Sequence, residues 1–198
     1  LSLNSSIILF LLLITLNLLS LAEFSQIFKN IFYKKKILIC ISIFFSIIYL
    51  SFFSLIIWLH LLSSDFKQVI SLVFVLIICI SSDIGGFVFG KLIGGKKITK
   101  ISPNKTYSGV IGSFLFAIIL SYFLIHFYKN ILIFNIEPLL IIFIISLISQ
   151  IGDLTISFLK RKAKMKDSGT ILPGHGGILD RIDGILLALP LGIMLVSF

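Results

Sequence analysis

Three aspartates of this chain lie where phosphate chemistry could use them. Asp153 lies in an apolar segment, whereas Asp180 and Asp183 lie three residues apart at the start of another. Such hard oxygen ligands suit Mg²⁺, which binds one or two carboxylates together with substrate phosphates. If the helix that carries Asp153 continues through the basic run that follows, Asp153, Ser157 and Lys160 share one face at spacings i, i+4 and i+7. A carboxylate, a hydroxyl and an ammonium would then lie in a row along one face of the helix.

Charge is concentrated in the connection between these two apolar segments. Residues 157–183 hold three of the eight acidic residues and six of the seventeen basic ones. The glycines of residues 173–177, PGHGG, permit a close approach of the backbone to a ligand. A lone histidine such as His175 is more often a hydrogen-bonded structural residue than a catalyst. A zinc site is disfavoured, because neither cysteine is near and no second histidine has suitable spacing.

A second polar constellation surrounds Asp83, near the end of an apolar segment. A carboxylate there is a functional candidate, although a helix-end aspartate that reaches the membrane interface is an equally good interpretation. Residues 85–91 fit GxxxxGK, the opening of a P-loop. We reject that match, because Leu92 replaces the required Ser or Thr and no buried strand precedes the segment. Gly86 and Gly90 form a GxxxG pair, for which close helix packing is the commoner explanation.

A third constellation precedes the next apolar segment. Ser102, Lys105 and Thr106 offer hydroxyl donors and a positive charge beside a predicted helix N-terminus, a natural place for phosphate. Serine and proline before a helix are also ordinary start signals. Both interpretations remain open for this segment.

The composition predicts the elements that position these residues. The chain is 58% hydrophobic and 13% charged, and its mean hydropathy is +1.17. These values indicate an all-α, polytopic integral membrane helical bundle of about six transmembrane helices. The expected spans are residues 3–21, 37–62, 69–90, 110–127, 139–159 and 178–196. Residues 37–62 suit one tilted helix, although two short re-entrant pieces are an alternative.

One membrane-embedded domain is expected to fill residues 1–198, with N-terminal helices in 1–79 and the chemical motifs in 80–198. The first span lacks a basic leader and a clear cleavage site, which favours a retained helix over a signal peptide.

Lysine and arginine in the connections predict the orientation of the bundle. The expected cytoplasmic connections carry Lys29 and Lys34–Lys36, then Lys91, Lys96, Lys97, Lys100 and Lys105, then residues 160–166. The alternate connections hold only Lys67 and Lys129. Six crossings with both termini outside satisfy this asymmetry, and the net charge of +9 then belongs to one membrane face. Attraction to anionic lipids would explain most of these lysines. A nucleic acid partner is not expected, because no soluble groove-reading module is present.

Four motifs with consistent spacing occur within residues 157–183: Ser157-x-x-Lys160-Arg161, Lys166-Asp167-Ser168-Gly169, Pro173-Gly174-His175-Gly176-Gly177 and Asp180-Arg181-x-Asp183. Together they resemble the signature of phosphatidate cytidylyltransferases, also called CDP-diacylglycerol synthases. Two weaker motifs also resemble that family: Asp83 with Gly90-Lys91, and Ser102-Pro103-x-Lys105-Thr106 with Gly109. The resemblance covers residues 80–198. The sequence departs from the family at Tyr107-Ser108 and Ile156, and bacterial members are usually longer.

The resemblance implies a Mg²⁺-dependent transfer in which phosphatidic acid attacks the α-phosphorus of CTP, giving CDP-diacylglycerol and pyrophosphate. Asp153 and Asp180 would hold the metal, with Asp183 as a further ligand or an orienting neighbour. Lys160 and Arg161 would bind phosphates and complete the catalytic set. The other expected substrate-binding residues are Ser157, Lys166, Asp167, His175, Gly176, Gly177, Arg181, Asp83, Lys105 and Thr106.

The expected partners are CTP, phosphatidic acid and the lipid bilayer. A homodimer and a second metal ion remain open. The expected location is a bacterial inner membrane, with the active site facing the cytoplasm.

Two other function classes fit the sequence less well. A CDP-alcohol phosphotransferase would also pair carboxylates near the cytoplasmic face, but its spaced aspartate pattern does not occur in the sequence. A transporter would explain intramembrane aspartates as ion or proton sites. A transporter would not need the four motifs of residues 160–183 (KR, KDSG, PGHGG and DRID) together in one connection between two helices.

Overall fold

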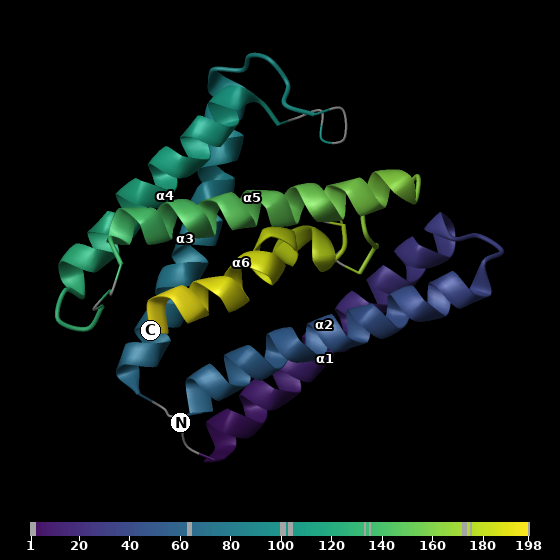
Figure 1. Ribbon diagram of the computed structural model, residues 1–198, viewed down its shortest axis with the longest axis horizontal. Coiled ribbons are helices and arrows are strands. Elements are labelled where there is room, and N and C mark those ends of the chain that lie inside the picture. The colour runs from purple at the N-terminus through teal and green to yellow at the C-terminus, as the bar shows by residue number, and fades with distance from the viewer. Residues whose placement is uncertain are drawn as a thin grey trace. The chain divides into compact units, whose positions relative to one another are not determined.

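The computed structural model contains six helices among the residues that it describes, and it confirms the all-α prediction. It describes residues 3–62, 65–99, 102, 105–132, 134, 136–171, 174 and 176–197. The helices are α1 (Leu3–Ile31), α2 (Lys36–Leu62), α3 (Phe66–Leu92), α4 (Tyr107–Phe127), α5 (Pro138–Lys162) and α6 (Leu179–Ser197), as Figure 1 shows. Across these described residues the only extended pairing is an isolated antiparallel bridge between Lys97 and Thr106.

Five helices, α1 to α5, are long and apolar enough to cross a membrane. The sixth predicted span also forms a helix, α6, but within the described part of the chain it is not in that set. Asp180, Arg181 and Asp183 all lie in its first five residues, and charges are costly in hydrocarbon. The fold is therefore a polytopic integral membrane helical bundle with five clear candidate spans.

Three helix boundaries matter for the functional residues. Residues 37–62 lie in one helix, α2, which removes the re-entrant alternative. The first helix continues from the predicted end at Leu21 to Ile31, so it includes Glu23 and Lys29. Helix α5 enters the basic run and ends at Lys162, within it. The helix still includes Asp153, Ser157 and Lys160, so these residues share one helical face as predicted.

The chain divides into two compact units, which are described separately. The first comprises residues 1–64 and 155–183, and the second comprises 65–154 and 184–198, so α5 and α6 contribute to both. In the first unit α1 and α2 pack as a hairpin, shown in purple and blue in Figure 1. The Ser54 hydroxyl donates to Asn17 Oδ1 over 3.0 Å. Nearer the open end of the hairpin, the rings of Phe10 and Trp58 meet edge to face at 5.3 Å.

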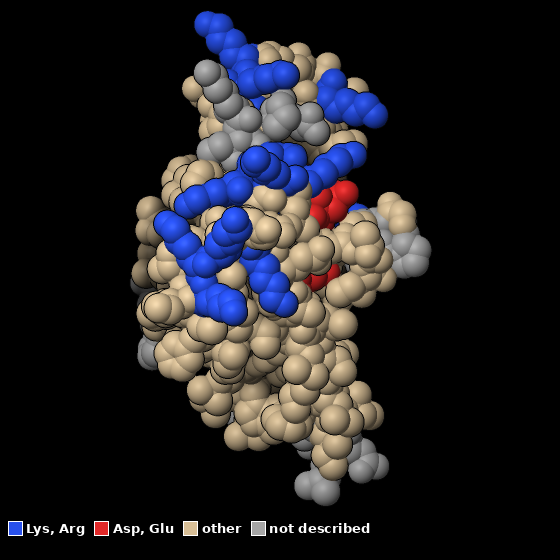
Figure 2. Space-filling model, turned by 90° about the vertical axis from the view of Figure 1, so that its right-hand side faces the viewer, with Lys and Arg blue, Asp and Glu red and all other residues tan. Residues whose placement is uncertain are grey.

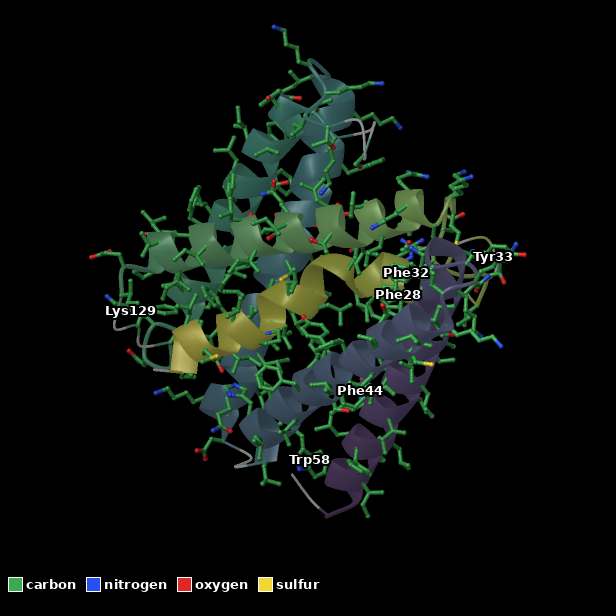
Figure 3. All side chains as sticks on the ribbon, turned by 45° about the vertical axis from the view of Figure 1, so that its right-hand side comes forward. Phe28, Phe32, Tyr33, Phe44, Trp58 and Lys129 are labelled. Carbon is green, nitrogen blue, oxygen red and sulfur yellow. The ribbon has the colours of Figure 1, made fainter. Side chains whose placement is uncertain are left out.

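An aromatic ladder runs along the C-terminal half of α1. Phe24, Phe28 and Phe32 follow at four-residue intervals, with ring centroids 5.9 Å and 6.5 Å apart. Phe28 and Phe32 are labelled near the end of α1 in Figure 3. The Lys162 ammonium lies 6.0 Å from the Phe32 ring, a cation–π contact. The ladder therefore ties the basic end of α5 to the end of α1.

In the second unit α3 and α4 approach closely through glycines. A Cβ added at Gly85 would collide with the Gly112 carbonyl oxygen and lie 2.6 Å from Phe116 Cβ. A Cβ at Gly86 would lie 2.6 Å from Ser113 Oγ. A Cβ at Gly90 would lie 3.3 Å from Thr106 Oγ1 and 3.7 Å from Gly109 Cα. Close packing is thus confirmed for the GxxxG pair, Gly86 and Gly90, and Gly85 is a further contact outside that pair. Ser82 of α3 also hydrogen-bonds Ser146 of α5 over 2.9 Å.

Candidate functional site

One polar cluster of the second unit joins three of the predicted site residues, Asp83, Lys105 and Asp153. The bridge at Lys97 closes the loop before α4, with the Ile98 N–H donating to the Lys105 carbonyl over 3.0 Å. The Lys105 ammonium forms an ion pair with Asp153 and lies 3.4 Å from the Gln150 carbonyl. Asp83 is within electrostatic range of both Asp153 and Lys105. The structure thus pairs Lys105 with Asp153 and brings a second carboxylate, Asp83, within electrostatic range of both.

Thr106, next to this cluster, caps helix α4. Its backbone is extended, and its hydroxyl oxygen accepts a hydrogen bond from the Gly109 N–H over 3.1 Å. This arrangement satisfies one of the backbone donors that a helix N-terminus leaves without a partner. Helix capping therefore accounts for Thr106 in this structure, and its role in phosphate binding stays a prediction.

A second cluster, in the first unit, is built around Asp180 in the first turn of α6. One oxygen, Oδ1, pairs with the Lys160 ammonium. The other, Oδ2, accepts from the Ser168 N–H at 2.8 Å, the Ser168 hydroxyl at 3.0 Å and the Gly177 N–H at 3.0 Å. Lys160 is only 9% exposed, which is unusual for a lysine. Asp180 therefore holds the end of α5 and both ends of the connecting loop.

The surroundings of Asp180 also set its pKa. The residue lies outside the five candidate membrane-spanning helices. Burial raises the pKa of this carboxyl, but the hydrogen bond from Lys160 and those from the Ser168 and Gly177 N–H groups outweigh burial and hold the pKa below its ordinary value of 3.8. Asp180 is thus stabilised as a carboxylate.

Glu23 of α1 is a member of this cluster that sequence reasoning missed. It is 2% exposed. Its oxygens accept hydrogen bonds from the Ile178 N–H at 2.8 Å, the Leu179 N–H at 2.9 Å and the Ser168 hydroxyl at 2.7 Å. The signal available in the sequence was a lone carboxylate two residues beyond the predicted first span, since an ionisable residue in an apolar helix is a functional candidate by default.

The motif glycines make room for Glu23. A Cβ on Gly177 would lie 2.5 and 2.6 Å from the two Glu23 oxygens, and a Cβ on Gly169 would lie 2.8 Å from Oε1. Gly176 has a φ of 82°, in the left-handed region that favours glycine. A close backbone approach to a ligand was expected at the glycines of residues 173–177. At Gly177 the nearest groups are the Ser168 hydroxyl and then the Glu23 carboxylate, both of which belong to the chain itself.

The remaining predicted site residues of the first unit differ in their exposure. Arg161 is exposed and donates to the Met165 carbonyl over 3.2 Å, beyond the end of α5. Ser157 and Asp183 are half-buried. The exposed residues are Lys166, Asp167 and Arg181. His175 lies outside the described residues. Their roles in substrate binding stay predictions.

The carboxylates are chemically suited to Mg²⁺ but are already engaged. No group of three or more His, Cys, Asp or Glu residues that could hold a metal ion occurs in the described ranges. Asp153 and Asp180 each hold a lysine ammonium instead. The donor chemistry fits a hard divalent cation, which would compete with Lys105 or Lys160 for these oxygens.

Comparison with known proteins identifies the family. The model of the cytidylyltransferase family matches residues 2–198. A phosphatidate cytidylyltransferase of Haemophilus influenzae is 38% identical over 135 residues, 66% of this chain and 47% of the relative. One of Helicobacter pylori is 42% identical over 137 residues, 66% and 48% of the two chains. One of Staphylococcus haemolyticus is 43% identical over 121 residues, which are 59% of this chain and 45% of the relative. The chain spans about half the length of these curated relatives. Because the family model covers nearly its whole length, the chain belongs to the cytidylyltransferase family.

Proposed function

We propose that this chain transfers the cytidylyl group of CTP to phosphatidic acid. The family match along residues 2–198 carries the proposal, and the names of the relatives supply both substrates. A phosphate oxygen of phosphatidic acid attacks the α-phosphorus of CTP and forms a new P–O bond. The bond to the β-phosphate breaks, and pyrophosphate leaves with the electron pair. The products are CDP-diacylglycerol and pyrophosphate.

Positive charge is what this reaction needs most from the protein. Two polyanions must approach each other, and such transfers depend on positioning and charge neutralisation more than on covalent catalysis. The chain has a net charge of +9, and among the charged side chains visible in Figure 2 the blue lysines and arginines predominate over the red acidic residues. Lys105 and Lys160, each already paired with a carboxylate, and Arg161 are the proposed phosphate-binding residues.

Magnesium is the proposed cofactor. When bound, it would neutralise charge on the reacting phosphates. The proposed ligands are Asp153 in the second unit, and Asp180 with Asp183 in the first. Activity that survives removal of all divalent cations by a chelator would exclude this role.

The membrane setting supports a lipid substrate. Five apolar helices place the chain in a bilayer, where phosphatidic acid would enter from the lipid side. The lysine-rich connections favour a bacterial inner membrane with the reacting residues on the cytoplasmic side.

Purified chain, CTP, magnesium and phosphatidic acid vesicles test the proposal. We expect a lipid-soluble nucleotidyl product with CTP, and none with ATP. Asp153→Asn and Asp180→Asn should abolish turnover while membrane insertion persists. Near-normal activity in either variant would remove that residue from the proposed metal site, and a folded wild-type chain without product would refute the proposal.

A further inference from the structure

Glu23 connects helix α1 to the N-terminus of α6. The first N–H groups of a helix have no partner within it. At α6 the N–H groups of Ile178 and Leu179 donate to the two oxygens of Glu23, one each. A negative charge at this end of a helix also interacts favourably with the helix dipole. Glu23 therefore caps α6 from a segment about 155 positions away in the sequence.

Ser168 links Glu23 to Asp180. Its hydroxyl oxygen lies 2.7 Å from Glu23 Oε2 and 3.0 Å from Asp180 Oδ2. A serine hydroxyl carries one hydrogen, so it donates to only one of these carboxylates at a time. The Ser168 N–H stays on Asp180 at 2.8 Å. The position of Ser168, and with it two of the donors to Asp180, is thus tied to Glu23.

The space around Glu23 is shaped to hold it. Glu23 is 2% exposed, and Ser168 is fully buried. A side chain at Gly169 would collide with the Glu23 carboxylate, and one at Gly177 would collide with the Ser168 hydroxyl and with that carboxylate. A carboxylate that only happened to be buried would not need two glycines of two separate motifs beside it.

We propose that Glu23 is a positioning residue for the cytidylyl transfer, acting through Ser168 and the start of α6 to fix Asp180. The inference rests on the proposed function. Glu23 touches no reacting atom in this scheme. It holds Ser168 and the N–H groups of Ile178 and Leu179, so that the donors which orient Asp180 stay in place during turnover.

Kinetics of Glu23 variants test this role. In Glu23→Gln one acceptor oxygen becomes an NH₂ group that faces a backbone donor. We expect kcat to fall about 10- to 100-fold, as for loss of a charged hydrogen bond, while KM for phosphatidic acid stays within about two-fold of the wild-type value. Glu23→Asp keeps both oxygens and should recover part of kcat. Ser168→Ala removes only the shared hydroxyl and should also lower kcat.

Asn17→Ala is the matched control. Asn17 is another polar residue of α1, and its hydrogen bond to Ser54 lies outside the cluster. This variant perturbs the α1–α2 hairpin but should leave kcat unchanged. An equal loss of kcat in Asn17→Ala would show that general disturbance of α1 is sufficient, and would overturn the proposal.

Amide hydrogen exchange gives a readout that does not depend on activity. Glu23→Gln should accelerate exchange at Ile178 and Leu179, and also at Ser168 and Gly177, whose N–H groups bond Asp180 and not Glu23. If exchange accelerates only at Ile178 and Leu179, Glu23 acts as a helix cap alone and the proposal is overturned. A wild-type kcat in Glu23→Gln would also overturn it. A folded wild-type chain without turnover would refute the proposed function. The exchange pattern would still show whether Glu23 holds the N–H donors to Asp180 in place.

Discussion

Lys160, near the end of α5, forms an ion pair with Asp180, in the first turn of α6, and each side chain is only 11% exposed. Removing two charges from water is costly, so such a pair persists only where further hydrogen bonds satisfy it. The Ser168 and Gly177 N–H groups supply these bonds to Asp180. The ion pair and the motif loop therefore form one structural unit.

Lys160→Met should destabilise the chain strongly. It leaves the Asp180 carboxylate largely buried without its cation, and breaking such a pair costs about 3 kcal/mol. Denaturant unfolding in detergent micelles measures the loss. Lys162→Met is the control, because it removes only cation–π contacts with Phe32 and Phe158, worth about 0.5 to 1 kcal/mol. Equal losses of unfolding free energy in the two variants would contradict a special contribution of the Lys160–Asp180 ion pair to stability.

The stability that Asp180 contributes should depend on pH in the acid range. Its folded-state pKa is lowered below 3.8, so its contribution is complete above that value and is lost as the pH falls through the folded-state pKa. The difference in unfolding free energy between wild type and Asp180→Asn should therefore stay constant between about pH 5 and 8 and shrink below pH 4. A difference that grows on acidification would contradict the assigned direction.

Gly169→Ala should destabilise the chain only while Glu23 is present. The three atoms nearest to the added Cβ all belong to Glu23, the closest at 2.8 Å. Overpacking of this kind costs about 1 to 3 kcal/mol. In a Glu23→Ala background the same substitution should cost almost nothing, which a double-mutant cycle on unfolding free energies would reveal. Additive losses would show that Glu23 does not fill the space beside Gly169.

Gly85→Ala should cost more stability than Gly86→Ala. At Gly85 the new methyl group meets the backbone carbonyl of Gly112 and the Phe116 Cβ, neither of which can easily move. At Gly86 it meets the Ser113 hydroxyl, which can rotate away. We expect a loss of about 1 to 3 kcal/mol for Gly85→Ala and a smaller one for its neighbour. The reverse order in thermal unfolding would argue against the α3–α4 packing described above.

Local patterns predicted most of the helices but not where the first one ends. Apolar runs give helix cores, and five of the predicted spans lie within the candidate membrane helices. The first span was expected to stop at Leu21, whereas α1 continues to Ile31. Tertiary contacts hold this part of the chain in place: Glu23 is buried against a loop 145 positions away, and the Lys162 ammonium lies 6.0 Å from the Phe32 ring.

The motif residues were predictable as a set, whereas their partners were not. The GxxxG pair near the end of α3 is a local pattern, and its packing role follows from spacing alone. The pairing of Lys105 with Asp153, and of Lys160 with Asp180, depends on which helix ends meet in the fold. A carboxylate expected to face a metal ion can equally hold an ammonium, and sequence does not distinguish the two.

Transfer of labelled CTP to lipid tests the central claim most directly. Purified chain is incubated with phosphatidic acid, magnesium and CTP labelled at either the α- or the γ-phosphorus, beside Asp180→Asn as control. We predict that the α-label enters the lipid phase, that the γ-label remains in water as pyrophosphate, and that the control transfers neither. Transfer of the γ-label to lipid, or no transfer of the α-label by a folded wild-type chain, would contradict cytidylyl transfer.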